Sequence, residues 1–164
     1  MRRYRSTVSP GGAKFTAKHE GGQSKDGLFH PYFDKLGQVW TIGFGHTEGV
    51  TKYSKSLTLR QATALLRYDL NKKYAPPVAR LTRALGLRLE AYEFNALVDV
   101  SYNLGFGVFG IGHDLGDALR TKDRRRIADS LLVYTKAADG SHPAGLVNRR
   151  HAERTYFLTG KDVA

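Results

Sequence analysis

Residues 19–47 contain a glutamate and an aspartate whose carboxyl groups could catalyse the hydrolysis of a glycosidic bond. This segment reads HEGGQSKDGLFHPYFDKLGQVWTIGFGHT, with Glu20 before two glycines and Asp34 at the end of a Tyr-Phe-Asp run. The reaction needs one carboxylic acid that keeps its proton for the leaving oxygen, and one carboxylate that acts on water or on the forming cation. Because Glu20 and Asp34 fall on different expected elements, the fold must bring them together.

The elements expected around the pair are a short helix and a small sheet. Residues 13–20 suit a helix with Phe15 and Ala17 turned inward, which the two following glycines would end. Residues 27–55 are rich in Gly, Tyr and Thr, with turn candidates at 35–38 and 43–49, and they indicate a small antiparallel sheet. Glu20 would then lie at a helix C-terminus and Asp34 on a hairpin.

Helical patterns dominate the rest of the chain. Thr58 and Gln61 form a capping-box pattern, and a helix follows that we expect to end at Pro76-Pro77. Its inward positions have helical spacing: Leu59, Ala62, Leu65, Leu66 and Leu70. Three later helices are expected: 88–104 with Phe94, Leu97, Val98 and Leu104 buried, one capped by Thr121 with Ile127, Leu131 and Leu132 inward, and one from Pro143 to Gly160.

The composition predicts a folded, strongly basic protein. The 164 residues are 41% hydrophobic, contain no cysteine, and carry 26 basic against 15 acidic residues, a net charge of +11. Such a charge attracts polyanions, either nucleic acid or the anionic polymers of bacterial envelopes. No zinc-finger spacing, aromatic RNA-binding strand or long basic helix is present, which disfavours specific nucleic-acid recognition. Neither a signal-peptide run after residues 1–5 nor an 18-residue apolar stretch occurs, so we expect synthesis in the cytoplasm.

Three segments in order resemble the phage-type lysozymes, the endolysins of glycoside hydrolase family 24. The first joins Glu-Gly at Glu20, Tyr-x-Asp at Asp34 and Thr-Ile-Gly-x-Gly-His at 41–46. The others are EFNALVDVSYNLG at 93–105 and GLVNRRHAERTYFLTG at 145–160. The resemblance covers about residues 13–160, and three motifs in the right order make it specific.

The resemblance implies a role for each candidate residue. Glu20 would be the general acid, and Thr41 would position the attacking water beside Asp34. Arg149 would pair with Glu20 and tie the final helix to the cleft. Supporting or saccharide-lining roles fall to Tyr102, Asn103, His46 and Asn148. No metal or organic cofactor is implied, and the histidines show no paired ligand spacing.

The residues themselves leave three questions open. Asp34 is favoured over Asp26 as the second carboxylate, because Asp26 lies in a Lys-Asp-Gly turn that its side chain could close. However, Glu20 and Asp34 are 14 apart in sequence, more than the family usually has. A helix C-terminus disfavours the Glu20 anion while a nearby Arg149 would favour it. Trp40 could stack on sugar or pack beneath the sheet.

The expected fold is α+β and lysozyme-like. A basic, flexible leader at 1–12 would precede one catalytic domain at 13–164. Within this domain we expect a small lobe at about 13–57 with a short antiparallel sheet, a linking helix at about 58–75 and a helical lobe at about 76–164. The cleft would lie between the lobes, where pockets are favoured.

The expected activity is that of a muramidase. Such an enzyme hydrolyses the β-1,4 bond between N-acetylmuramic acid and N-acetylglucosamine in peptidoglycan, with inversion when the carboxyls stand roughly 6.5–9.5 Å apart. The chain would act as a monomer on the cell wall after release from the host cytoplasm. Two alternatives use the same fold: a catalytically silent wall-binding protein, which an intact Glu-Asp-Thr set disfavours, and a lytic transglycosylase.

Overall fold

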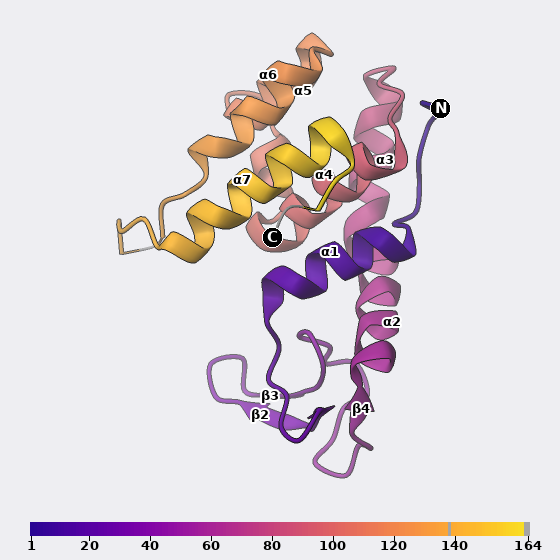
Figure 1. Cartoon of the computed structure of the whole chain (residues 1–164), viewed down its shortest axis with the longest axis vertical. Coiled ribbons are helices and arrows are strands. Elements are labelled where there is room, and N and C mark those ends of the chain that lie inside the picture. Colours follow the sequence, from indigo (N-terminus) through magenta and orange to yellow (C-terminus); the bar gives the residue numbers. More distant parts are fainter. Residues whose placement is uncertain (138, 163–164) are drawn as a thin grey trace.

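A small lobe of short strands and a larger helical lobe are joined by one long helical segment (Figure 1). The structure is a computed structural model that describes residues 1–137 and 139–162. The strands lie at one end of the molecule, and helix α1 lies between them and the helical lobe (Figure 1). The predicted α+β architecture of two lobes with a linking helix is confirmed.

Helix α1 spans Pro10–Glu20 and delivers Glu20 to its C-terminal end. It begins three residues earlier than expected. Ser9 caps it by accepting a hydrogen bond from the amide of Gly12, and proline suits the first helical position, where no amide donor is needed. The helix ends at Gly21, whose φ of 68° few other residues adopt easily. Phe15 and Ala17 are buried as predicted.

The expected flexible leader at 1–12 is instead packed against the helical lobe. Arg3 exchanges backbone hydrogen bonds of 3.0 and 2.9 Å with Leu89. Val8 is only 1% exposed, and its amide donates to Oδ1 of Asn71 at 2.7 Å. The partners of these contacts lie far along the chain, so the composition of the leader alone does not reveal them.

The small lobe contains two two-stranded antiparallel sheets. Strand β1, Leu28–Phe29, pairs with β4, Leu57–Thr58. Strand β2, Tyr32–Asp34, pairs with β3, Val39–Thr41, across the turn expected at 35–38. The second turn expected, at 43–49, also occurs and is closed by a bridge from Ile42 to His46. The strands are short, so this lobe relies on packing against α2.

The linking helix does not end at the two prolines. Helix α2, Leu59–Asp69, runs through a π-helical turn, η1 at Leu70–Tyr74, into helix α3, Ala75–Ala84. A proline ring inside an α-helix collides with the carbonyl four residues back. The wider π turn relieves this collision, and Pro76 and Pro77 stand at the start of α3, where missing amide donors are tolerated.

One expected core position of α2 is on the surface instead. Leu59 is 60% exposed, whereas Ala62, Leu66 and Leu70 are at most 2% exposed. Leu59 is the first residue of α2, and at this point the small lobe provides too little structure to cover it.

The helical lobe is built around α4, which is buried along most of its length. α4 spans Ala91–Leu104, begins with a capping box formed by Glu90 and Glu93, and buries Phe94, Leu97 and Val98 completely. The elements packed around it are η2 Phe106–Phe109, α5 Asp114–Thr121, α6 Arg124–Ser130, η3 Leu131–Val133 and α7 Ala144–Thr159. As predicted, α7 starts after Pro143 and ends at Gly160. None of the described helices is long and apolar enough to cross a membrane.

The cap of α6 was assigned to the wrong residue. Asp123, not Thr121, accepts a hydrogen bond from the amide of Arg126. Thr121 is the last residue of α5, a helix that the sequence did not reveal, and its hydroxyl donates back to the carbonyl of Ala118. Both residue types can cap a helix, and the adjacent helix decides between them.

Candidate active site

Glu20 contacts an arginine from the far end of the chain. Nη1 of Arg149, on α7, donates to Oε1 of Glu20 at 2.5 Å. The Glu20 side chain keeps 24% of its surface exposed, whereas that of Arg149 keeps 7%. The carboxyl is therefore held from the buried side while part of it still faces solvent, as a group that must reach a substrate requires.

Arg149 is itself fixed by Asp99 of α4. Its Nη2 and Nε donate to the two carboxylate oxygens of Asp99 at 3.0 and 3.3 Å. This two-pronged contact fixes the plane of the guanidinium, which a lysine could not do. Complete burial acts to raise the pKa of Asp99, but the charge of Arg149 and hydrogen bonds from Glu153, Arg149 and Thr16 hold the pKa below its usual range.

A third buried carboxyl, Glu153, completes the cluster. It lies on α7, 3.4 Å from Nε of Arg149 and 2.9 Å from Nη2 of Arg150, with no exposed surface. Burial, followed by the charge and hydrogen bonding of Asp99, raises the pKa of Glu153 well above its usual range. The contact with Arg150 favours the anion. However, burial outweighs this contact, so Glu153 favours its protonated form.

Asp34 and Thr41 share one face of the β2–β3 hairpin. Residues 32 and 41 are paired, as are 34 and 39, so alternation places all four side chains on the same face. Oδ1 of Asp34 accepts from the amide of Leu36 at 3.0 Å, and Thr41 is buried at 3% exposure. The carboxylate and the hydroxyl thus stand on a common surface, on a strand pair only three residues long.

The opposite face of this hairpin carries two aromatic rings. Trp40 and Phe33 are paired across the strands and their rings meet edge to face, with centroids 5.7 Å apart. Phe33 remains 44% exposed. Trp40 therefore lies on the face of the hairpin opposite Asp34, packed against Phe33.

Asp26 has a local structural role. It and Gly27 form a two-residue turn, with φ of 54° and 74°, closed by reciprocal 2.9 Å backbone hydrogen bonds between Lys25 and Leu28. Asp-Gly is a preferred pair for such a turn. The turn was predicted here, but the backbone closes it rather than the aspartate side chain.

His46 and Tyr102 connect the hairpin region to helices. Both ring nitrogens of His46 face oxygens, Oδ2 of Asp69 at 2.8 Å and the carbonyl of Glu48 at 3.0 Å. The hydroxyl of Tyr102 donates to the carbonyl of Phe44 at 2.6 Å. Burial, followed by the negative charge of Glu20, raises the pKa of Tyr102, so this hydroxyl keeps its proton.

The two asparagines differ in their surroundings. Oδ1 of Asn103 accepts from Nη2 of the buried Arg150 at 2.6 Å, so this side chain supports the cluster on α7. Asn148, which directly precedes Arg149 on α7, is exposed. The structure thus brings Glu20, Arg149 and Tyr102 together, and it places Asp34 with Thr41.

Asp99 and Glu153 were missed as site residues, although the sequence contains a signal for each. Asp99 interrupts the apolar run around Val98 and Val100, where a charge must be paired to be buried. Glu153 stands four residues after Arg149, which places both on one helix face. A charged residue within an inward-facing stripe therefore marks a buried ion cluster.

A two-lobed α+β fold with an acid at the end of α1 and a carboxylate on a hairpin defines a lysozyme-like protein. The family model for phage lysozyme matches residues 23–153, and the chain belongs to this family. It is 36% identical over 120 residues to the endolysin of Lactococcus phage c2, covering 73% of this chain and 48% of that protein. It is 30% identical over 145 residues to the SAR-endolysin of Enterobacteria phage P21, covering 86% and 84%.

The fold comparison gives the same class. A crystal structure of a P22 lysozyme mutant superposes with a TM-score of 0.73 at 26% identity, covering 94% of this chain and all of that one.

The match to the endolysins of Bacillus phage B103 and Lactococcus phage c2 takes in only 45% and 48% of their length. The chain therefore spans about half of the first curated relatives that it matches.

Proposed function

We propose that this protein is a muramidase that hydrolyses the β-1,4 bond between N-acetylmuramic acid and N-acetylglucosamine in bacterial peptidoglycan. The observation that carries the proposal is the fixed Glu20 carboxyl, held by Arg149 at 2.5 Å on one side and partly exposed on the other. Membership of the phage lysozyme family supports a wall-degrading activity.

In this mechanism the two sides of the site perform different steps. Glu20 donates its proton to the leaving glycosidic oxygen. Asp34 accepts a proton from water that the hydroxyl of Thr41 helps to orient, since a hydroxyl both donates and accepts. Water attacking from the face opposite the leaving group gives inversion. Arg149 orients the acid, and no cofactor is needed.

The proposed partner is the wall itself, and the protein acts on it as a monomer. A net charge of +11 draws the molecule to the anionic polymers of the envelope. The protein would reach the wall after synthesis in the host cytoplasm.

The test is product analysis combined with one matched pair of variants. Cell walls digested by the protein should release muropeptides with a reducing N-acetylmuramic acid. Mass spectrometry would show products lighter by one water if the protein were a transglycosylase, and no products if it only bound the wall. Glu20→Gln should abolish wall clearing, because an amide has no proton to donate.

Glu48→Gln is the control for that substitution. Glu48 also loses a salt bridge, to Lys72 at 2.7 Å, but it is 57% exposed and serves no proposed step. Its wall clearing should match that of the unmodified protein. Residual clearing by Glu20→Gln above a few per cent would remove Glu20 from the mechanism.

A further inference from the structure

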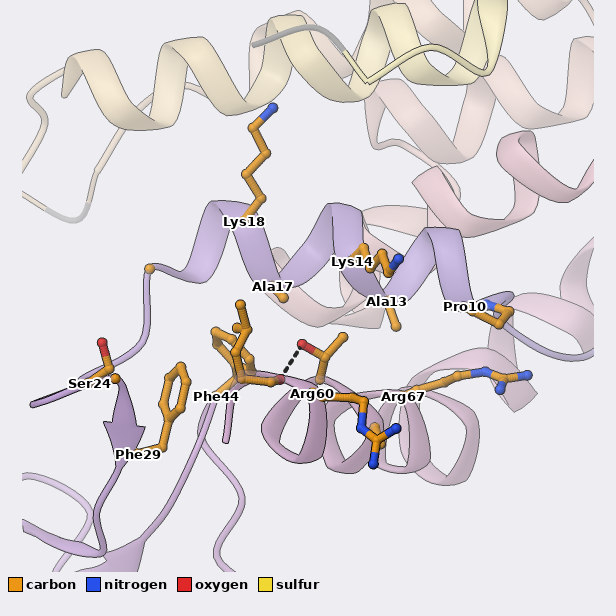
Figure 2. Close-up of a pocket in the computed structure, with 15 residues that line it drawn as sticks. Pro10, Ala13, Lys14, Ala17, Lys18, Ser24, Phe29, Phe44, Arg60 and Arg67 are labelled. Atoms are coloured by element: carbon orange, nitrogen blue, oxygen red, sulfur yellow. Dashed lines mark hydrogen bonds between the residues drawn. The ribbon is translucent and has the colours of Figure 1, made fainter. Parts of the chain in front are cut away.

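A large groove lies between α1 and α2, on residues to which the proposed function gives no task. Its volume is about 990 Å³, within the range of small-molecule sites. Figure 2 shows Ala13 and Ala17 of α1 turned toward α2, with Phe29 and Phe44 at one end of the groove and Arg67 at the other. The groove is therefore elongated and bounded by two helices.

The walls of the groove are apolar. Ala13, Ala17, Phe29 and Phe44 are each at most 8% exposed, and the two phenylalanine rings meet with centroids 5.0 Å apart. The opposite wall includes Leu59, an apolar side chain that the fold leaves 60% exposed. Small alanines along one wall leave room for a narrow, flexible chain.

Cations surround the groove, and no acidic residue is among the described residues that line it. Lys14 and Arg60 are exposed at the rim. Arg67 uses only its Nε internally, in a 3.0 Å hydrogen bond to the carbonyl of Val8. Lys18 does not contribute, because its ammonium turns away to Asp162 at 3.0 Å. The rim thus suits an anionic group.

We propose that this groove binds one acyl chain of a phosphate-headed amphiphile, with the alkyl chain along the alanine wall and the phosphate at the arginine end. Burying an alkyl chain against Ala, Phe and Leu removes apolar surface from water. Arg60 and Arg67 offer guanidinium forks, which match phosphate oxygens in pairs. An acidic amphipathic helix is wider than a single alkyl chain, so it would fit only if the wall formed by Ala13 and Ala17 moved outward.

The groove is separate from the site that acts on sugar. The Glu20 carboxyl is joined to Arg149 of α7, whereas Ala17 and Ala13 face α2. Occupancy of the groove therefore requires no contact with Glu20, Asp34 or Thr41. Binding can be measured whether or not the protein cleaves walls, so the two proposals fail independently.

The experiment is a titration of the whole protein with palmitoyl lysophosphatidylglycerol below its critical micelle concentration. Calorimetry gives the affinity, and NMR follows the ring signals of Phe29 and Phe44. We expect saturable one-to-one binding that shifts both rings. Palmitoyl lysophosphatidylcholine, which has the same chain and no net charge, should bind more weakly, and glycerol phosphate should not shift the rings.

Two pairs of variants locate the binding. Ala64→Glu places a charge in the groove on an exposed helix position, and it should weaken binding by at least about tenfold. Its control is Ala84→Glu, at an exposed position of α3 outside the groove. Arg60→Gln should weaken binding up to about fivefold, with Arg80→Gln as control. Both controls should bind as the unmodified protein does.

Several results would overturn the proposal. Both lysophospholipids contain a phosphate, so equal affinity for them would show that the cationic rim recognises no net negative charge. An unchanged affinity in Ala64→Glu would show that the chain does not bind in the groove. Ring shifts with glycerol phosphate alone would show that the site takes an anion without a chain. An acidic amphipathic peptide that shifts the rings, with no response to the lysophospholipids, would make the groove a peptide site instead.

Discussion

The two proposed catalytic carboxyls stand on very different supports. Glu20 is tied to Arg149, which is tied to a fully buried Asp99, so three separate elements determine its position. Asp34 stands on a three-residue strand and accepts a hydrogen bond from the amide of Leu36 at the turn. One carboxyl is held by a buried ion cluster and the other by an exposed hairpin.

This difference suits the two tasks. A proton donor must stay fixed relative to the bond that it cleaves, and buried paired charges resist displacement because separating them is costly. The carboxylate that handles water has to admit water and substrate, and a short hairpin permits small adjustments. Substitutions on the two supports should therefore affect stability and activity in different proportions.

The largest effect is expected for Arg149→Ala. Its removal leaves the buried Asp99 and the partly buried Glu20 unpaired, and it should lower the free energy of unfolding by about 3–5 kcal/mol. Chemical denaturation measures this loss. Arg154→Ala is the control on the same helix, because its partner Asp129 is 47% exposed, and it should cost less than about 1 kcal/mol.

The same variant should also lose wall-clearing activity. Without the guanidinium the Glu20 carboxyl loses the 2.5 Å contact that holds it in place, so clearing should fall by about tenfold or more. Arg149→Lys should restore only part of both properties, because a point charge cannot hold both Asp99 and Glu20. Unchanged clearing with unchanged stability would show that Arg149 is an ordinary surface charge.

Asp34→Asn should cost activity but little stability. We expect wall clearing to fall by about a hundredfold or more, since an amide cannot accept the proton from water, a loss of about 2.7 kcal/mol in the barrier. The unfolding free energy should change by less than about 0.5 kcal/mol. Asp26→Asn serves as control and should keep full activity, because asparagine also suits its turn. The reverse ranking of the two would show that Asp26, and not Asp34, is the second carboxylate.

Glu153→Gln tests the proton in the buried cluster. The pKa of Glu153 is raised in the folded protein, so above its ordinary value of 4.5 the folded state keeps a proton that the unfolded state releases. Stability therefore falls as pH rises through this window. The variant should remove up to about 1.4 kcal/mol per pH unit of that slope.

Glu90→Gln should change the pH dependence of stability in the opposite direction. A hydrogen bond from the N-terminal ammonium lowers the pKa of Glu90, so its contribution to stability is present above its ordinary value and is lost as pH falls. Denaturation curves should separate the two effects if they extend from about pH 2 to 8, because the Glu90 effect lies below its ordinary pKa and the Glu153 effect above it. Identical slopes in Glu153→Gln and the unmodified protein would mean that Glu153 is ionised in the fold.

The smallest effect is expected for Gly37→Ala, in the hairpin turn. An added Cβ would lie 3.0 Å from Oδ2 of Asp34 and push the carboxylate by a few tenths of an ångström. Activity should fall severalfold, less than about 1.4 kcal/mol, while stability stays within about 0.5 kcal/mol. Gly107→Ala meets no atom within 4 Å and should leave activity unchanged. Equal activities would show that Asp34 tolerates displacement.

The sequence was most informative where residue type decides local conformation. Gly21 and Gly160 marked helix ends, the turn at 35–38 was located, and the buried stripe of α4 followed from its spacing. The resemblance placed Glu20 and Arg149 in one site, and the structure shows them in contact. The catalytic roles of these residues remain predictions.

The features that the sequence did not reveal depend on contacts between distant segments. The two prolines predict a helix end, but a π turn that depends on packing around α2 and α3 admits them. The basic leader predicts a flexible tail, but it contacts Leu89 and Asn71, which lie far along the chain. The groove between α1 and α2 arises only when both helices are in place.

The helical segment between the lobes also has a mechanical property. Pro76 and Pro77 follow the π turn after Ala75 and have no amide hydrogen, so two carbonyls of that turn receive no helical hydrogen bond. A helical segment that lacks two backbone hydrogen bonds bends more easily at that point than elsewhere. We therefore expect any change in the angle between the lobes to be concentrated at residues 70–77, remote in sequence from both carboxylates.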